Sequence, residues 1–148
     1  MLAKQAQMVP GRMEGGIAMR IDRMFFATSL VFALIGMALG QYMGLSGRHG
    51  QHVTHAHVLL VGLVISFVHA VSHRLWLQDV SSRWARLHYA LHTLGAAGMA
   101  AGLWAMFGGV VGEAQAGPFL GLSGLLVMAA VAMSLAQVWR SARATPSS

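Results

Sequence analysis

Eight histidines stand out in this chain because it has few other polar side chains that could do chemistry. They form an outer group of four (His49, His52, His55 and His57) and an inner group of four (His69, His73, His88 and His92). Imidazole nitrogens ligate heme iron, copper and zinc. The two groups are therefore the candidate sites. The helices that carry the histidines determine which side chains come together and so which cofactor or ion each group can bind.

Composition indicates that these helices lie in a membrane. Apolar residues make up 56% of the 148 residues and charged residues only 9%, against roughly 25% charged in soluble domains. The net charge of +6 is too dispersed for a nucleic-acid surface. The chain has no cysteine, which excludes disulfides, thiolate-held zinc, iron–sulfur clusters and cysteine nucleophiles.

The positions of the charged residues predict where the chain crosses the membrane. Charged residues enclose four uncharged stretches of 24 to 26 residues, and about 20 helical residues span the hydrocarbon. We therefore predict an all-α, up-down bundle of four transmembrane helices, near 24–43, 55–77, 86–107 and 118–139. This membrane domain covers residues 21–140, between tails at 1–20 and 141–148.

The distribution of basic residues predicts the orientation. Nine Lys and Arg residues fall on one side of the predicted membrane, and Arg48 alone falls on the other. By the positive-inside rule both termini lie in the cytoplasm. The expected location is the inner membrane, with the first apolar stretch kept as an anchor because it is longer than the core of a signal peptide.

The inner histidines have a symmetry typical of an antiparallel hairpin. The residue numbers of His73 and His88 have the same sum as those of His69 and His92, so the members of each pair should lie at equal depth. Each helix carries its two histidines four residues apart, on one face. The four could hold a heme, which would be the second one if the outer group also holds a heme, or they could bind copper or zinc. Alternatively, His73 and His88 extend to the lipid headgroups while the other two bond to backbone carbonyls.

The outer histidines have a different geometry. His55 and His57 are two residues apart, so on a regular helix their side chains diverge by about 200° and serve two separate sites. By the same helical arithmetic one polar face of small residues and histidines runs through the membrane: His55, Gly62, Ser66, His69 and His73. The alternative is that this helix simply begins in a wet, histidine-rich loop.

Glycine spacing bears on packing. Gly36, Gly40 and Gly44, and separately Gly98 and Gly102, have the spacing that lets helix backbones approach closely in lipid. One face of the third predicted helix combines histidine, glycine and methionine: His88, His92, Gly95, Met99, Gly102 and Met106. That face is compatible with a porphyrin, although methionines at this spacing more often pack in a core.

Three segments carry a resemblance to a known family. Asp22–Phe26, Thr54–Gly62 and Leu87–His92 resemble a group of small bacterial four-helix membrane proteins that are similar to the catalytic subunit I of heme-copper oxidases and nitric oxide reductases. The resemblance covers about residues 22–140. It implies a fold like one four-helix arc of the large subunit, which has three such arcs in pseudo-threefold symmetry.

The resemblance also implies a ligand set. In one oxidase arc a His-x-His motif on the second helix ligates two different hemes, and His55-Ala56-His57 matches it, so His55 and His57 are the expected axial ligands of heme b. Shared ligation between neighbouring chains implies a homotrimer, with a dimer as the alternative. His49 and His52 could add a copper ion.

Departures from the oxidases limit what the resemblance implies. The adjacent histidine pair and the His-x-x-x-Tyr of the copper site have no counterpart, since Gly102–Phe107 stands where the pair would be. The four spans also lack Asp, Glu and Lys. The resemblance is thus to an oxidoreductase, but these departures argue against oxygen reduction coupled to proton pumping.

Three functions follow from these patterns. The first is a heme b protein that transfers electrons, received from a quinol or a cytochrome, or binds a diatomic gas such as O2 or NO. The second is a copper or zinc transporter or chaperone that uses its histidines to carry the ion. The third is a structural accessory subunit whose histidines only pack.

Overall fold

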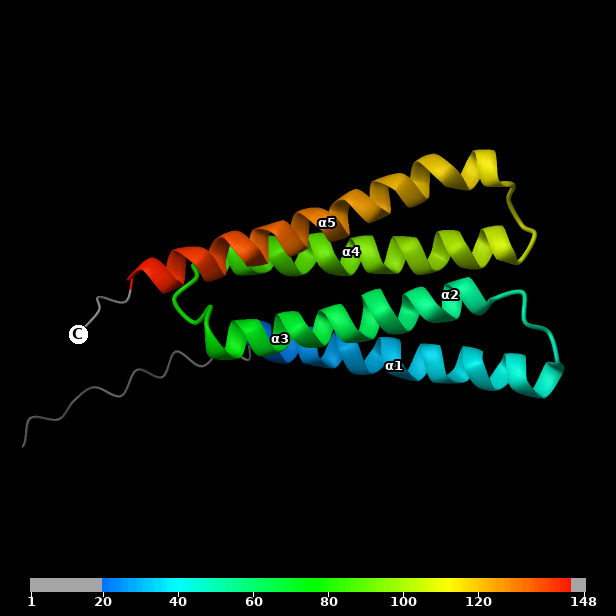
Figure 1. Ribbon diagram of the computed structural model, residues 1–148, viewed down its shortest axis with the longest axis horizontal. Coiled ribbons are helices and arrows are strands. Elements are labelled where there is room, and N and C mark those ends of the chain that lie inside the picture. Colours follow the sequence, from blue (N-terminus) through cyan, green and yellow to red (C-terminus); the bar gives the residue numbers. More distant parts are fainter. Residues whose placement is uncertain (1–19, 145–148) are drawn as a thin grey trace, which may run out of the picture.

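The computed structural model describes residues 20–144, and side chains up to Ser141. Four long helical segments run alternately up and down (Figure 1). They are α1 (Ile21–Ser46), a segment in three consecutive parts (α2, His52–His57; η1, Val58–Ile65; α3, Ser66–Leu75), α4 (Ser82–Phe107) and α5 (Glu113–Ala144). The predicted all-α, four-helix architecture is confirmed.

The helices differ from the predicted ranges mainly at their ends. The fourth helix begins at Glu113, so Pro118 lies inside it rather than at its start. Pro118 is the sixth residue of α5, beyond the first four whose N–H groups lack helical partners, so it leaves the helix one backbone hydrogen bond short near its start. Residues 141–144 continue α5, whereas the sequence predicts that the C-terminal tail begins at residue 141. The rest of the predicted tails, residues 1–19 and 145–148, lies outside the described residues.

All four segments are long and apolar enough to cross a membrane. The spans are Ile21–Ser46, His52–Leu75, Ser82–Phe107 and Glu113–Ser141. Large apolar side chains cover the outside of the bundle; Leu34, Leu45 and Met128 are among the most exposed. These features fit the predicted multi-pass membrane protein.

The up-down order gathers basic residues at one end of the bundle. The helix ends that carry them lie together: Arg20, Arg23, Arg74, Arg83, Arg86 and Arg140. We call this the basic end. The opposite end, called the Arg48 end, contains the connections 47–51 and 108–112, in which Gly47 and Gly109 adopt positive φ angles of 67° and 73°. Glycine accepts that conformation without strain and ends a helix cleanly.

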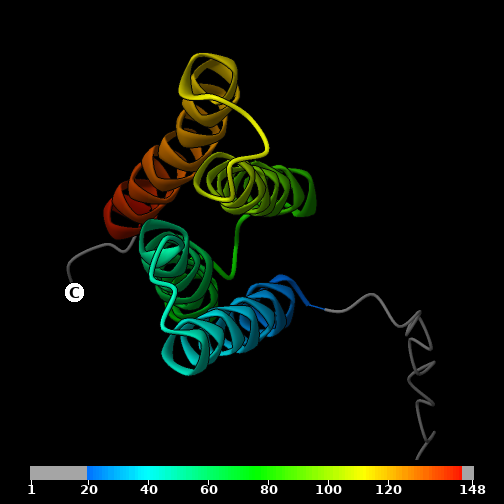
Figure 2. The same cartoon turned by 90° about the vertical axis from the view of Figure 1, so that its right-hand side faces the viewer.

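The bundle consists of two closely packed helix pairs (Figure 2). One pair is α1 with α2–η1–α3, and the other is α4 with α5. Glycines allow both contacts: a Cβ on Gly36 would overlap the Leu59 side chain, and a Cβ on Gly95 would lie 2.8 Å from the Ser123 carbonyl oxygen. The predicted close packing of Gly36 and Gly40, and of Gly98 and Gly102, is confirmed. Gly44 has no neighbour within 4 Å.

The second span is not a regular α-helix. Val58–Ile65 is a π-helix of eight residues, whereas most π segments are single turns within α-helices and often lie near functional sites. Helical angles computed for a continuous α-helix therefore do not hold across it. From Thr54 to Ser66 the buried residues of this span lie four apart, at Thr54, Val58, Gly62 and Ser66. The outer part of the predicted polar face from His55 to His73 stays a prediction: His55 and Gly62 both lie against α1, at Gly40 and Phe32, although His55 is only half-buried.

Candidate functional site

The inner histidines form one buried cluster between α3 and α4. Their exposed fractions are 3% or less. His73 Nε2 lies 2.9 Å from His88 Nδ1, and the ring centroids of His69 and His92 are 4.8 Å apart. The pairing predicted from the hairpin symmetry is thus confirmed. The alternative in which His73 and His88 reach the headgroups is wrong, because both rings point into the bundle and bond to each other.

Two serines bond to these rings, Ser134 to two of them and Ser66 to one, and the sequence does not predict the role of Ser134. Ser134 of α5 places its Oγ 3.0 Å from His88 Nε2 and 3.0 Å from His69 Nδ1. Ser66, at the start of α3, bonds to His92 Nε2 at 2.8 Å. In the sequence Ser134 is one of three polar residues of the predicted span 118–139, with Ser123 and Gln137, and no spacing rule links it to the histidines.

Phe25 of α1 fills the space between the four inner rings. It is fully buried, and its ring centroid lies 5.0 to 5.9 Å from the centroids of all four imidazoles. It stacks on His73 with an interplanar angle of 18°. A porphyrin does not fit among rings that already enclose a phenyl group at close-packed distance.

The inner histidines are also not arranged to coordinate a metal ion. Three buried ring nitrogens have no hydrogen-bond partner: His69 Nε2, His73 Nδ1 and His92 Nδ1. Among the described residues, however, no three ligating side chains are placed to hold a metal ion. The arrangement does not fit the second heme or metal site for which these four histidines were candidates, and it is instead a hydrogen-bonded network.

The outer histidines share a different bonding pattern. His55 Nδ1 lies 2.9 Å from the Gly36 carbonyl oxygen of α1, and His57 Nδ1 lies 2.9 Å from the Val53 carbonyl oxygen of its own helix. A carbonyl oxygen only accepts, so Nδ1 must be the protonated nitrogen. In the neutral ring, Nε2 then keeps a free lone pair. A metal-ligating histidine almost always has this arrangement, with its second nitrogen donating to a carbonyl or carboxylate.

Gly40 of α1 leaves room for the imidazole of His55. A Cβ at Gly40 would lie 2.9 Å from Cε1 of the imidazole, so the ring packs directly on the α1 backbone. α2 is a regular α-helix, and residues two apart on such a helix diverge by about 200°. The bonds agree with this geometry, because His55 bonds across to α1 whereas His57 bonds back to its own helix.

His49 and His52 have the same bonding pattern but are exposed. Their Nδ1 atoms bond to the carbonyl oxygens of Gly47 and His49 at 3.1 and 2.9 Å. The candidate copper site has no third ligand beside them within the part of the chain that the structure describes.

The glycines on the histidine and glycine face of α4 pack against α5, whereas His92 bonds to Ser66 of α3. A Cβ at Gly95 would meet the Ser123 carbonyl and Val127, and one at Gly102 would meet Leu120. Met99 and Met106 are half-buried. The gaps predicted to be compatible with a porphyrin are therefore filled by helix packing.

Comparison of the chain with protein-family models, with curated proteins and with solved structures found no match. The site is therefore interpreted from its geometry.

Proposed function

We propose that the chain is a heme b-binding membrane protein in which His55 and His57 supply axial ligands. The observation that carries this proposal is the fixed tautomer of both imidazoles: each donates from Nδ1 to a backbone carbonyl and leaves Nε2 unprotonated. Heme would supply one-electron chemistry and an iron centre that binds diatomic gases.

The residues around His55 hold its ring. The carbonyl of Gly36 fixes the ring orientation, and Gly40 lets the imidazole lie against α1. At the same depth an apolar groove of about 450 Å³ runs between α1, the second span and α4, and its lining includes Leu39, Thr54 and Trp104. A low-polarity wall of this kind suits a porphyrin, which is largely apolar.

The proposed role is electron transfer or binding of O2 or NO without proton pumping. Asp22 and Glu113 lie in the first turns of their helices, and the rest of the four spans contains no carboxylate or lysine. A quinol or a cytochrome would be the electron donor. The chain would reside in the bacterial inner membrane with the basic end, and therefore both termini, in the cytoplasm.

Opposed ligands require more than one chain for each heme. A protomer has one helix with His55 and His57, and the two rings point to different sides of it. We therefore propose that His55 of one chain and His57 of the next clamp one heme, which in a closed heterologous ring gives a homotrimer.

Substitution of the outer histidines tests the proposal. Heme content per chain should fall strongly in His55→Ala and in His57→Ala, because each removes one axial ligand. The matched controls are His49→Ala and His52→Ala, which remove exposed imidazoles with the same Nδ1 bonding and should leave most of the heme bound. Full heme occupancy in the His55→Ala, His57→Ala double variant would refute the assignment.

A further inference from the structure

Four side chains form an unbroken hydrogen-bond chain inside the basic half of the bundle. It runs from His73 to His88 at 2.9 Å, from His88 to Ser134 at 3.0 Å and from Ser134 to His69 at 3.0 Å. Three helices contribute to it, namely α3, α4 and α5. The two terminal atoms, His73 Nδ1 and His69 Nε2, are buried and have no partner. A chain with an unused nitrogen at each end can accept a proton at one end and release one at the other.

Neutral imidazoles satisfy this chain in two proton orders. In the first, His73 donates from Nε2 to His88, His88 donates to Ser134, and the serine hydroxyl donates to His69. In the second, every donor and acceptor is reversed. Each order uses one N–H for each ring and satisfies all three hydrogen bonds. In the first order His73 Nδ1 is free to accept a proton and His69 Nε2 carries one to release. When each member hands its own proton to the next, a proton added at His73 Nδ1 and one lost from His69 Nε2 convert the first order into the second, and reorientation of the rings and the hydroxyl restores the first.

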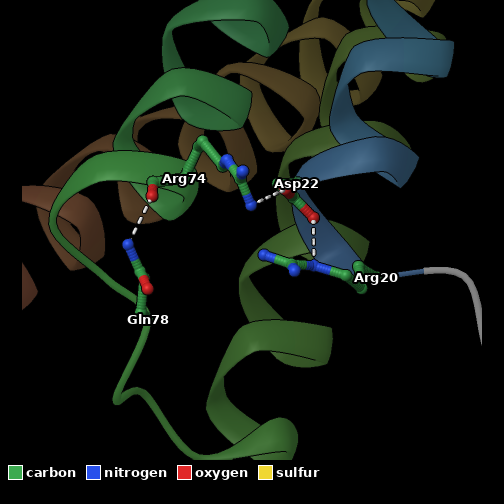
Figure 3. Close-up of polar contacts among 4 residues, drawn as sticks. All are labelled: Arg20, Asp22, Arg74 and Gln78. Carbon is green, nitrogen blue, oxygen red and sulfur yellow. Dashed lines mark hydrogen bonds and ion pairs between the residues drawn. The ribbon is translucent and has the colours of Figure 1, made fainter.

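The His73 end of this chain faces the basic end. His73 lines a groove of about 550 Å³ together with Asp22, Gln78, Ser82 and Arg86. Figure 3 shows Asp22 between Arg20 and Arg74, at 3.3 and 4.0 Å, with Gln78 bonded to the Arg74 carbonyl. Polar and charged groups of this kind keep water beside a site that otherwise lies among apolar helices.

The His69 end of the chain leads inward and then stops. The ring of His69 contacts that of His92, whose Nδ1 is also without a partner and whose Nε2 bonds to Ser66. Beyond Ser66 the second span continues as the apolar π-helix Val58–Ile65. The polar path therefore opens at the basic end and stops inside the bundle. A proton that enters it is held within the membrane and does not cross to the other side.

We propose that the inner histidines and Ser134 are a proton relay that takes up a proton from the basic end at His73 and passes it through His88 and Ser134 to His69. Imidazole and hydroxyl chains are among the groups through which membrane proteins move protons. The proton arrives from groove water and departs from His69 toward His92, so no other reactant is needed. The relay uses no residue of the proposed heme site.

Histidine nitrogen NMR of the full chain in lipid nanodiscs tests the relay. With ¹⁵N-labelled histidine, the relay predicts that the ring nitrogens of His73, His88 and His69 exchange between tautomers and exchange protons with water. In Ser134→Ala the exchange at His69 should be lost while that at His73 and His88 continues, and Ser134→Thr should restore it. The control is Ser123→Ala, which removes a hydroxyl that bonds only to the Phe119 carbonyl of the same helix.

Two outcomes would overturn the proposed relay. Fixed tautomers at all inner histidines in the unaltered chain would show a static packing network, and this result needs no variant to fold. Unchanged exchange at His69 in a helical, monodisperse Ser134→Ala protein would equally contradict the proposed order of transfer. Heme content is measured separately, so a failure of the relay leaves the heme proposal standing, and the reverse also holds.

Discussion

Gly40 of α1 lies directly against the imidazole of His55, so that a Cβ at this position would stand 2.9 Å from Cε1. The ring cannot simply swing away, because its Nδ1 donates to the carbonyl of Gly36 one turn earlier on the same helix. Two glycines of α1 thus hold one histidine, the first through its carbonyl and the second through its missing side chain.

This contact predicts the effect of a single methyl group. Gly40→Ala should push the ring off its carbonyl partner and weaken heme binding by roughly tenfold or more, as loss of an orienting contact does for metal ligands. Heme titration of the purified variants gives the measurement. Gly44→Ala is the matched control, since Gly44 lies one turn further along α1 with no atom within 4 Å. Equal affinities for the two variants would contradict the role of Gly40.

Phe25 should be the largest single packing contribution to the inner cluster. Phe25→Ala removes a fully buried ring that contacts all four inner imidazoles, and truncation of such a side chain costs about 3–5 kcal/mol. Reversible unfolding in mixed detergent micelles measures the loss. Phe26→Ala, which removes the neighbouring, 45% exposed ring, should cost much less; similar losses for the two would contradict the packing described for Phe25.

The proposed orientation is tested by reporter fusions. A reporter attached after Ser148 should be active only in the cytoplasm, and one inserted in the 108–112 connection should be active only in the periplasm. The reason is the clustering of arginines at the basic end. Periplasmic activity of the fusion after Ser148 would reverse the orientation.

The proposed sharing of ligands is tested by native mass spectrometry of the protein extracted in detergent. We expect three chains with one heme for each interface. A stable dimer would keep shared ligation but reject the threefold ring. A monomer loaded with heme would reject sharing altogether.

The sequence allowed the helices and the inner pairing to be predicted, because both depend on local rules. Long uncharged stretches must be helical in a membrane, and antiparallel neighbours with a short turn fix which residues are level, as His73 and His88 demonstrate. The divergence of His55 and His57 followed from the same helical geometry.

Features that depend on long-range packing could not be predicted. The π-helix Val58–Ile65 has no signature in an apolar run of this length. The insertion of Phe25 between four histidines, and the bridging by Ser134, bring residues from the first and last helices to the central hairpin. Helical periodicity relates residues within one helix, so it could not reveal either contact.

The absorption spectrum of the purified protein, expressed with ample heme supply, shows whether this chain binds heme. Ligation by two imidazoles predicts a Soret band in the oxidised protein and sharp, separate α and β bands on reduction. Bound copper or zinc without a Soret band would instead favour the transporter or chaperone. A protein with neither heme nor metal would refute heme binding and favour a structural accessory subunit.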